Sequence, residues 1–278
     1  MGTKQSEIKE PLITPLSRKY YDYATNEQNL KHYRATDVRI CLEKICDEII
    51  IDMVSEQAKS EWKDYDLHSK LKASKHFLNK KVVSRLIAAK IVGNSGTHEG
   101  EEGEFEEEDI EEAIDAIRDF SIEIFVSYFE KNGFKPTAGT WIPTAFSTLP
   151  PIYRIEILER YYLKNNSWFV IDKLSKAYMK AGRMEKAEQF LLDCYKKHEL
   201  TDEEYCWLVE SIKLLESNKD LLPISKDLQA AQDKFNALVE EINVEEKNAF
   251  IYLLSSILNG KENDKDTKGT NEHEVREE

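Results

Sequence analysis

The strongest constraint on the fold of this chain is an apolar stripe that repeats every three or four residues through five turns. Its members are Ile110, Ala113, Ile114, Ile117, Ser121, Ile124, Phe125 and Tyr128. This spacing predicts one long amphipathic helix, and Gly133 just after it is typical of a helix stop. A second stripe, from Val38 to Met53, predicts another helix on the same grounds.

Helical patterns continue through most of the remaining sequence. Residues 67–92 predict two shorter helices with a break near Asn79 and Lys80. The segment 93–96 is predicted to end the second helix, with Gly93 interpreted as its C-cap. Six more patterns follow at 151–164, 167–181, 184–198, 201–217, 223–241 and 244–258. With only ten glycines and seven prolines, a turn-rich β architecture is disfavoured, so we predict an all-α fold in two helical halves.

The proline-rich stretch at 135–150 divides the chain into its predicted parts. The sequence predicts a leader at 1–16, a helical bundle at 17–134, this linker, a second helical domain at 151–258 and an acidic tail at 259–278. The tail is polar and has no hydrophobic anchor, so we expect it to be disordered.

The formal net charge of −14 is distributed unevenly along the chain. In the segment 99–112, ten of 14 residues are acidic and none is basic, and the final twenty residues carry a further net charge of −3. The rest of the chain is therefore close to neutral. With 41% hydrophobic residues the chain can bury a core, and no apolar run approaches the ~20 residues of a membrane-spanning helix. Since its start has no apolar signal region, we expect a cytoplasmic protein.

The segment 68–90 carries a local charge of +7 with no acidic residue. Its basic residues are Lys70, Lys72, Lys75, Lys80, Lys81, Arg85 and Lys90. A basic helical face of this kind is the footprint expected for a phosphate backbone, so these residues are candidate nucleic-acid ligands. Two alternatives stay open: an ordinary solvated helix face, or a face that the acidic segment 99–112 covers until RNA or a partner displaces it.

His98 is the one candidate for acid–base chemistry. It follows the end of a predicted helix and adjoins Glu99, and both surroundings favour the protonated ring. Such a histidine can relay protons in RNA cleavage while Lys90 holds the phosphate, whereas a capping or packing role is the alternative.

Other chemistry-bearing residues give weaker signals. The four cysteines, Cys41, Cys46, Cys194 and Cys206, have no zinc spacing and are interpreted as buried thiols. We expect no metal and no cofactor, because the sequence has neither a calcium loop nor a phosphate-binding glycine loop. A group of early tyrosines, Tyr20, Tyr21, Tyr23 and Tyr33, fits either base stacking or the core and rim of the first helix.

A set of small and apolar residues in the second half is similar to a tetratricopeptide-like helical hairpin. These residues are Leu174, Ser175, Tyr178, Gly182, Ala187, Leu191 and Cys194. Small residues stand where two helices cross, with Gly182 at the turn. An ordinary antiparallel helix pair is the alternative, because a shift of 34 residues finds no second copy.

Two groups of residues in the first half resemble the HEPN superfamily. Ala35, Arg39, Leu42, Glu43 and Ile45 lie on an early helix, and Gly93, Asn94 and His98 form a Gly-Asn-x-x-x-His turn at the end of a later one. The resemblance covers residues 17–133 and is closest to a prokaryotic domain of unknown function that is often fused to restriction and other defence proteins. It implies a bundle of four to five helices, frequently dimeric.

The nuclease members of that superfamily join an Arg-x(4–6)-His motif from two protomers into a metal-independent endoribonuclease site. This chain departs from the motif, since the basic residue is Lys90, seven residues separate it from His98, and Arg85 lies further upstream. A lysine offers a point charge where arginine offers a fork.

These observations lead to one leading hypothesis and two alternatives. We expect a non-catalytic binding or regulatory subunit of a prokaryotic defence or mobile-element system, such as antiviral defence, that recognises RNA, another nucleic acid or a partner protein. We expect it to act as a homodimer or within a complex, away from the membrane. The alternatives are a HEPN-type endoribonuclease that uses His98 and Lys90, and a pure protein–protein adaptor.

Overall fold

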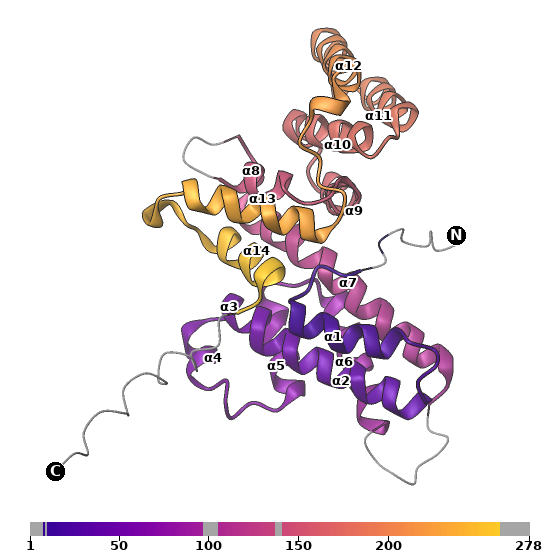
Figure 1. The fold of residues 1–278 in the computed structure, drawn as a ribbon, viewed down its shortest axis with the longest axis vertical. Coiled ribbons are helices and arrows are strands. Elements are labelled where there is room, and N and C mark those ends of the chain that lie inside the picture. The colour runs from indigo at the N-terminus through magenta and orange to yellow at the C-terminus, as the bar shows by residue number, and fades with distance from the viewer. Residues whose placement is uncertain (1–7, 9, 97–104, 137–140, 262–278) are drawn as a thin grey trace, which may run out of the picture.

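The computed structural model describes residues 8, 10–96, 105–136 and 141–261 of the chain, and within these ranges every regular element is a helix (Figure 1). This confirms the all-α prediction. None of the helices in the described ranges is both long and apolar enough to cross a membrane.

The first half of the chain forms a helical bundle. Its main helices are α1 (Pro15–Thr25), α2 (Lys31–Ile45), α5 (Leu67–Ala73), α6 (Lys80–Ser95) and α7 (Glu107–Asn132). Short elements fill the connections: the π-helix η1 (Cys46–Ile50), α3 (Ile51–Met53), α4 (Glu56–Ser60) and the 3-10 helix η2 (Ser74–His76). α2, η1 and α3 run on from one another, so the predicted stripe from Val38 to Met53 lies on one helical segment with a π-helical turn inside it.

α7 is the spine of the molecule. Its 26 residues give a length of about 39 Å, and every member of the predicted stripe from Ile110 to Tyr128 is buried. The helix ends at Gly133, whose φ of 80° is the left-handed conformation that favours glycine. α6 packs along α7, while α9 (Pro151–Tyr162) also packs on it.

The predicted C-cap role of Gly93 is wrong. α6 continues to Ser95, so Gly93 lies inside the helix, where it is buried. The reason is tertiary: a Cβ at Gly93 would lie 2.6 Å from the Cβ of Arg39 on α2. At Gly96, the actual cap, a Cβ would lie 2.6 Å from the carbonyl oxygen of His32. Both glycines are needed because α6 crosses α2 at close range.

The second half begins as a stack of helices. After α9 come α10 (Trp168–Lys180), α11 (Met184–Lys196) and α12 (Asp202–Ser217), each packed on the one before it. α10 and α11 form a hairpin with Gly182 at its turn, at a φ of 77°. The residues singled out around it, from Leu174 to Cys194, are buried apart from Gly182.

The last helices do not extend this stack. The chain passes the 3-10 helix η3 (Lys219–Leu221) and returns to α13 (Leu228–Glu241), the 3-10 helix η4 (Val244–Glu246) and α14 (Ala249–Asn259). Figure 1 shows the segment after α12 running back past α10 and α9 to the start of α13. Phe250 of α14 packs against Phe125, Tyr128 and Phe129 of α7, with ring centroids 5.3–6.0 Å apart.

The predicted domain boundaries stay a prediction, and the structure adds four facts about them. Leu12 and Ile13, in the predicted leader, are fully buried. The predicted linker contains α8 (Ile142–Ser147), which packs on α14. At the start of the predicted tail, Lys261 pairs with Asp52 at 2.8 Å. From residue 262 onward, the predicted disordered tail lies outside the described residues.

Candidate nucleic-acid interface

The basic segment 68–90 folds as α5, η2 and α6. The side chain of Asp66 caps α5 by accepting the amide of Ser69, and that of Asn79 caps α6 by accepting the amide of Lys81. The apolar residues of the two helices, among them Leu71 and Leu86, point into the bundle, which leaves the cations on the outer side.

Three of the seven predicted nucleic-acid ligands already face an acidic side chain of the protein. Lys70 pairs with Asp47 at 2.7 Å, and Arg85 pairs with Asp119 at 2.5 Å. Hydrogen bonds from Ser69 lower the pKa of Asp66, and the charge of Lys90 lowers it further. These three cations therefore serve the fold, at least in part.

The other four, Lys72, Lys75, Lys80 and Lys81, are exposed. Among the described residues, no acidic side chain forms an ion pair with any of them. They lie at the corner where the chain passes from α5 through η2 into α6. The basic segment 68–90 therefore contains some cations that interact with acidic side chains and four exposed lysines that form no ion pair within the described part of the chain.

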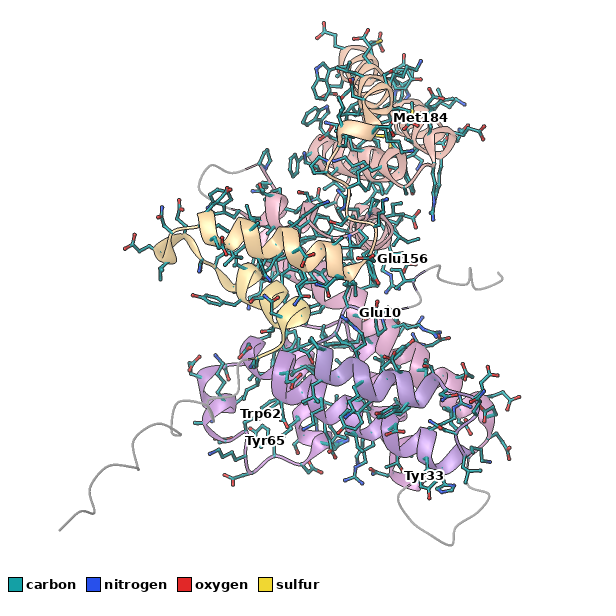
Figure 2. All side chains as sticks on the ribbon, in the orientation of Figure 1. Glu10, Tyr33, Trp62, Tyr65, Glu156 and Met184 are labelled. Carbon is teal, nitrogen blue, oxygen red and sulfur yellow. The ribbon has the colours of Figure 1, made fainter. Side chains whose placement is uncertain are left out.

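A cavity of about 670 Å³ opens at this corner. Its cationic or basic lining residues are Lys72, Lys75, His76 and Lys131, and the remaining ones are Met53, Val54, Ser55, Gln57, Ala58, Tyr65, Ser69, Ala73 and Phe77. None of these residues is Asp or Glu. Figure 2 shows Tyr65 beside Trp62 on this side of the bundle, and their ring centroids are 6.1 Å apart.

The composition of this lysine cavity favours an anion. The lining combines three ammonium groups and an imidazole with several apolar side chains, and it carries no carboxylate to compete with a ligand. Two serine hydroxyls and an amide add neutral hydrogen-bond donors. Sequence reasoning found Lys72 and Lys75 but missed Lys131, because Lys131 lies in the last turn of α7 and only tertiary packing brings it to α5.

A second cavity of about 560 Å³ adjoins the first and shares Met53, Phe77 and Lys131 with it. It lies between η1 and α3, the end of α7, and α14, and its lining includes Glu48 and Asp52. Because acidic and basic groups are mixed there, it has no clear preference for an anion.

The residues that carry the family resemblance meet at the other end of α6. Arg39 pairs with Glu43 at 3.1 Å, and Gly93 contacts Arg39 as described above. Asn94 follows, half-buried, on the same helix. Because α6 rises about 1.5 Å per residue, this group lies roughly 20 Å along the helix from Lys80 and Lys81. The predicted catalytic residue His98 lies outside the described residues.

The described part of the acidic segment does not cover the basic corner. Arg34 of α2 is buried and pairs with both Glu107 and Glu111, the latter at 2.7 Å. Lys31 donates to the carbonyl oxygen of Phe105 at 2.7 Å. Residues 105–111 are thus fixed to α2, and they help to start α7 because acidic side chains in a first turn complement the helix dipole.

The tyrosines and cysteines divide between core and surface. Tyr21 is buried, and its hydroxyl accepts from Arg118 at 2.6 Å, while Tyr23 and Tyr33 are exposed. Tyr33 lies at the far end of the bundle from Tyr65 (Figure 2).

Three cysteines, Cys41, Cys46 and Cys194, are buried as predicted. The prediction for Cys206 is wrong, because that residue lies on the outer side of α12 and is exposed. The described residues contain no cluster of three or more His, Cys, Asp or Glu side chains that fits a metal ion.

Comparison with known proteins places a family match on the first helical bundle. Residues 26–131 match the model of a family described as a domain of unknown function (DUF4145). This range runs from the end of α1 to the end of α7. It therefore contains the lysine cavity and the point where α6 crosses α2 at Gly93 and Arg39. No curated protein and no solved structure matches the chain.

Proposed function

We propose that this chain is a non-catalytic nucleic-acid-binding subunit that holds the phosphate backbone of RNA at the lysine cavity. One observation carries the proposal: Lys72, Lys75 and Lys131 line a cavity without a single carboxylate, and Lys80 and Lys81 extend the positive surface beside it. Ammonium groups bind phosphate as point charges. When they neutralise phosphates, counterions leave the nucleic acid, and this release supplies most of the affinity for its backbone.

The partly buried aromatic rings support a single-stranded ligand. Tyr65 and Phe77 line the same cavity as the lysines. Single-stranded nucleic acids are held by cationic grooves that track the backbone and by aromatic side chains that stack on bases. A duplex has its bases already stacked, so these rings add nothing to its binding.

The finer architecture and the biological setting belong to the same proposal. We take the first half as a HEPN-like bundle and the second as tetratricopeptide-like, in a cytoplasmic regulatory subunit of a prokaryotic defence or mobile-element system. The family match at 26–131 supports a distinct module there, and the defence setting follows from the resemblance of Arg39, Glu43, Gly93 and Asn94 to that superfamily. A homodimer or a larger complex is part of this proposal.

Binding of a fluorescently labelled single-stranded oligouridylate to the full chain tests the central part. We expect Lys72→Gln/Lys75→Gln to weaken binding about tenfold at moderate salt, because two phosphate contacts are lost. The matched control is Lys196→Gln/Lys213→Gln, which makes the same change in net charge on α11 and α12. Equal losses from the two double variants would contradict a site at the cavity.

The same samples test the non-catalytic part. We expect the oligouridylate to be recovered intact after long incubation with wild-type protein. Cleavage by the wild type that disappears in His98→Ala would replace this proposal with the endoribonuclease alternative. Binding by a protein partner, with no binding of RNA, would favour the adaptor alternative.

A further inference from the structure

A group of cationic residues lies in the other half of the molecule and includes a buried arginine. Arg154 on α9 is only 7% exposed, and its Nε atom has no hydrogen-bond partner. Among the described residues, no acidic side chain pairs with it. Burial lowers the pKa of the Arg154 guanidinium to about 10, and no carboxylate offsets that effect. Burying a charge without a partner is costly, so such a residue is rarely retained for stability.

The groups around Arg154 are also cationic. Burial lowers the pKa of Lys180 on α10 to about 8, and the charges of Arg154, Lys173 and Lys176 contribute to that shift. Burial and the charge of Arg154 also lower the pKa of Lys234 on α13. The cations of α9, α10 and α13 are therefore close enough for their charges to act on one another.

Asp172 is the acidic residue that faces this cluster, and its carboxylate is already engaged. Its two oxygens lie 2.6 Å from the Lys176 ammonium and 3.3 Å from that of Lys173. Neither Arg154 nor Lys180 forms an ion pair with an acidic side chain among the described residues, although the charge of Asp172 partly opposes the lowering of the Lys180 pKa.

An exposed aromatic pair lies at the opposite end of α10. Trp168 and Trp207 are 36% and 50% exposed, and their ring centroids are 5.4 Å apart. The Lys176 ammonium lies 5.3 Å from the centre of the Trp207 ring. From Trp168 to Lys180 the helix rises about 18 Å, which an extended peptide spans with five or six residues.

We propose that the junction of α9, α10 and α13 binds an acidic peptide segment of a partner protein, with one carboxylate held by Arg154 and Lys180. An apolar side chain about five residues away along the same segment reaches Trp168 and Trp207. This site is separate from the lysine cavity, so the proposal does not depend on the RNA-binding function.

The burial of Arg154 favours a carboxylate over a nucleic-acid phosphate. A guanidinium fork matches the two oxygens of a carboxylate, and an Asp or Glu side chain or a peptide C-terminus presents them on a narrow stem. A phosphodiester is flanked by two sugars, which do not fit against a guanidinium that is nine-tenths covered. The exposed tryptophans alone fit either ligand, so Arg154 decides between them.

Isothermal titration calorimetry of the full chain tests the proposal. The probe is a capped hexaglutamate, with a capped hexaglutamine as the uncharged control and a single-stranded oligouridylate as the nucleic-acid control. We expect Arg154→Gln to weaken hexaglutamate binding at least about tenfold, which is the loss of one strong charge-assisted contact. Lys180→Gln weakens it about threefold, because one partner remains.

Arg160→Gln is the matched control, since Arg160 lies on the same helix but pairs with Asp119 at 2.6 Å. We expect it to leave hexaglutamate binding unchanged. A melting temperature of Arg154→Gln at or above that of the wild type shows that its binding loss is not a folding defect.

Three results would overturn the proposal. They are no binding of hexaglutamate to the wild type, equal binding by wild type and Arg154→Gln, and hexaglutamine binding as well as hexaglutamate. Binding of the oligouridylate that requires Arg154 would assign the site to nucleic acid instead of a peptide.

Discussion

Arg34 in the first bundle and Arg154 in the second half are both buried, with 2% and 7% of their surface exposed, yet their surroundings are opposite. Arg34 donates to the carbonyl oxygen of Ala24 at 2.7 Å and pairs with Glu107 and Glu111. Arg154 has no ion pair within the described part of the chain, and its neighbours Lys180 and Lys234 are cationic.

The contrast distinguishes two roles of a buried arginine. Arg34 stabilises the fold, whereas Arg154 is the residue that we propose binds a partner's carboxylate. The bundle neutralises its buried cation internally, and by doing so it ties α1, α2 and the start of α7 together. The second half holds its cation without compensation. A partner that supplies the missing carboxylate gains the interaction energy that the fold does not use.

The largest effect is expected for Arg34→Met. The substitution removes the group that joins three helices and leaves two carboxylates without their partner, so we expect a loss of about 3 kcal/mol in the free energy of unfolding. Chemical denaturation measures it. A loss below about 0.5 kcal/mol, the range of ordinary surface substitutions, would remove the structural half of the comparison.

The glycines of the two regions provide the next test. At Gly93 a Cβ would collide with Arg39, so we expect Gly93→Ala to cost about 2 kcal/mol even after the gain in helix propensity. At Gly182 the nearest atom to a Cβ is 3.7 Å away, and only the φ of 77° opposes alanine. Gly182→Ala should therefore cost about 1 kcal/mol. The reverse order of the two losses would contradict the close approach of α6 to α2.

Arg154→Met should have the opposite sign to Arg34→Met. Because the buried guanidinium has no partner, replacing it with an apolar side chain of similar length should raise the free energy of unfolding by about 1 kcal/mol. Denaturation of the two methionine variants side by side measures the contrast. A marked loss of stability in Arg154→Met would mean that Arg154 has a structural partner.

The smallest effect is a pH dependence from Lys180. Its folded-state pKa is lowered to about 8, below the ordinary value of about 10.4 in an unfolded chain. Between these values the unfolded chain binds more protons, so stability attributable to Lys180 rises with pH. Lys180→Met should therefore be more stable than the wild type near pH 7, and the difference should shrink by about pH 9.5.

Other groups do not disturb that comparison. The groups that face Lys180 are Arg154, Lys173, Lys176 and Asp172, and they are present in both proteins. The buried tyrosines and cysteines titrate alike in both and cancel in the difference. A difference that stays constant or widens with pH would contradict an uncompensated charge at this junction.

Local patterns were sufficient to predict most of the helices. The stripe from Ile110 to Tyr128 and the stop at Gly133 are properties of a single segment, so the sequence predicts α7 directly. The prediction for Gly93 was wrong because a glycine that ends a helix and one that allows two helices to cross look alike in one sequence. Only the position of Arg39 on α2 distinguishes them.

The candidate sites could be predicted only in part, for the same reason. The run from Lys70 to Lys90 marks a cationic surface, but which of its cations are open depends on Asp47 and Asp119, which lie far away in the sequence. Arg154 has no local signal at all, because its surroundings come from α10 and α13. Charge runs are visible in a sequence, whereas the absence of a counterion is a tertiary property.

The salt dependence of oligouridylate binding tests the central claim most directly. A protein that neutralises phosphates loses affinity linearly on a log–log plot against salt, with a slope of about −0.7 per contact for single strands. We predict that Lys72→Gln/Lys75→Gln makes this slope shallower by about 1.4, while Lys196→Gln/Lys213→Gln leaves it unchanged. A slope unaffected by the loss of Lys72 and Lys75 would contradict a phosphate-binding function for the lysine cavity.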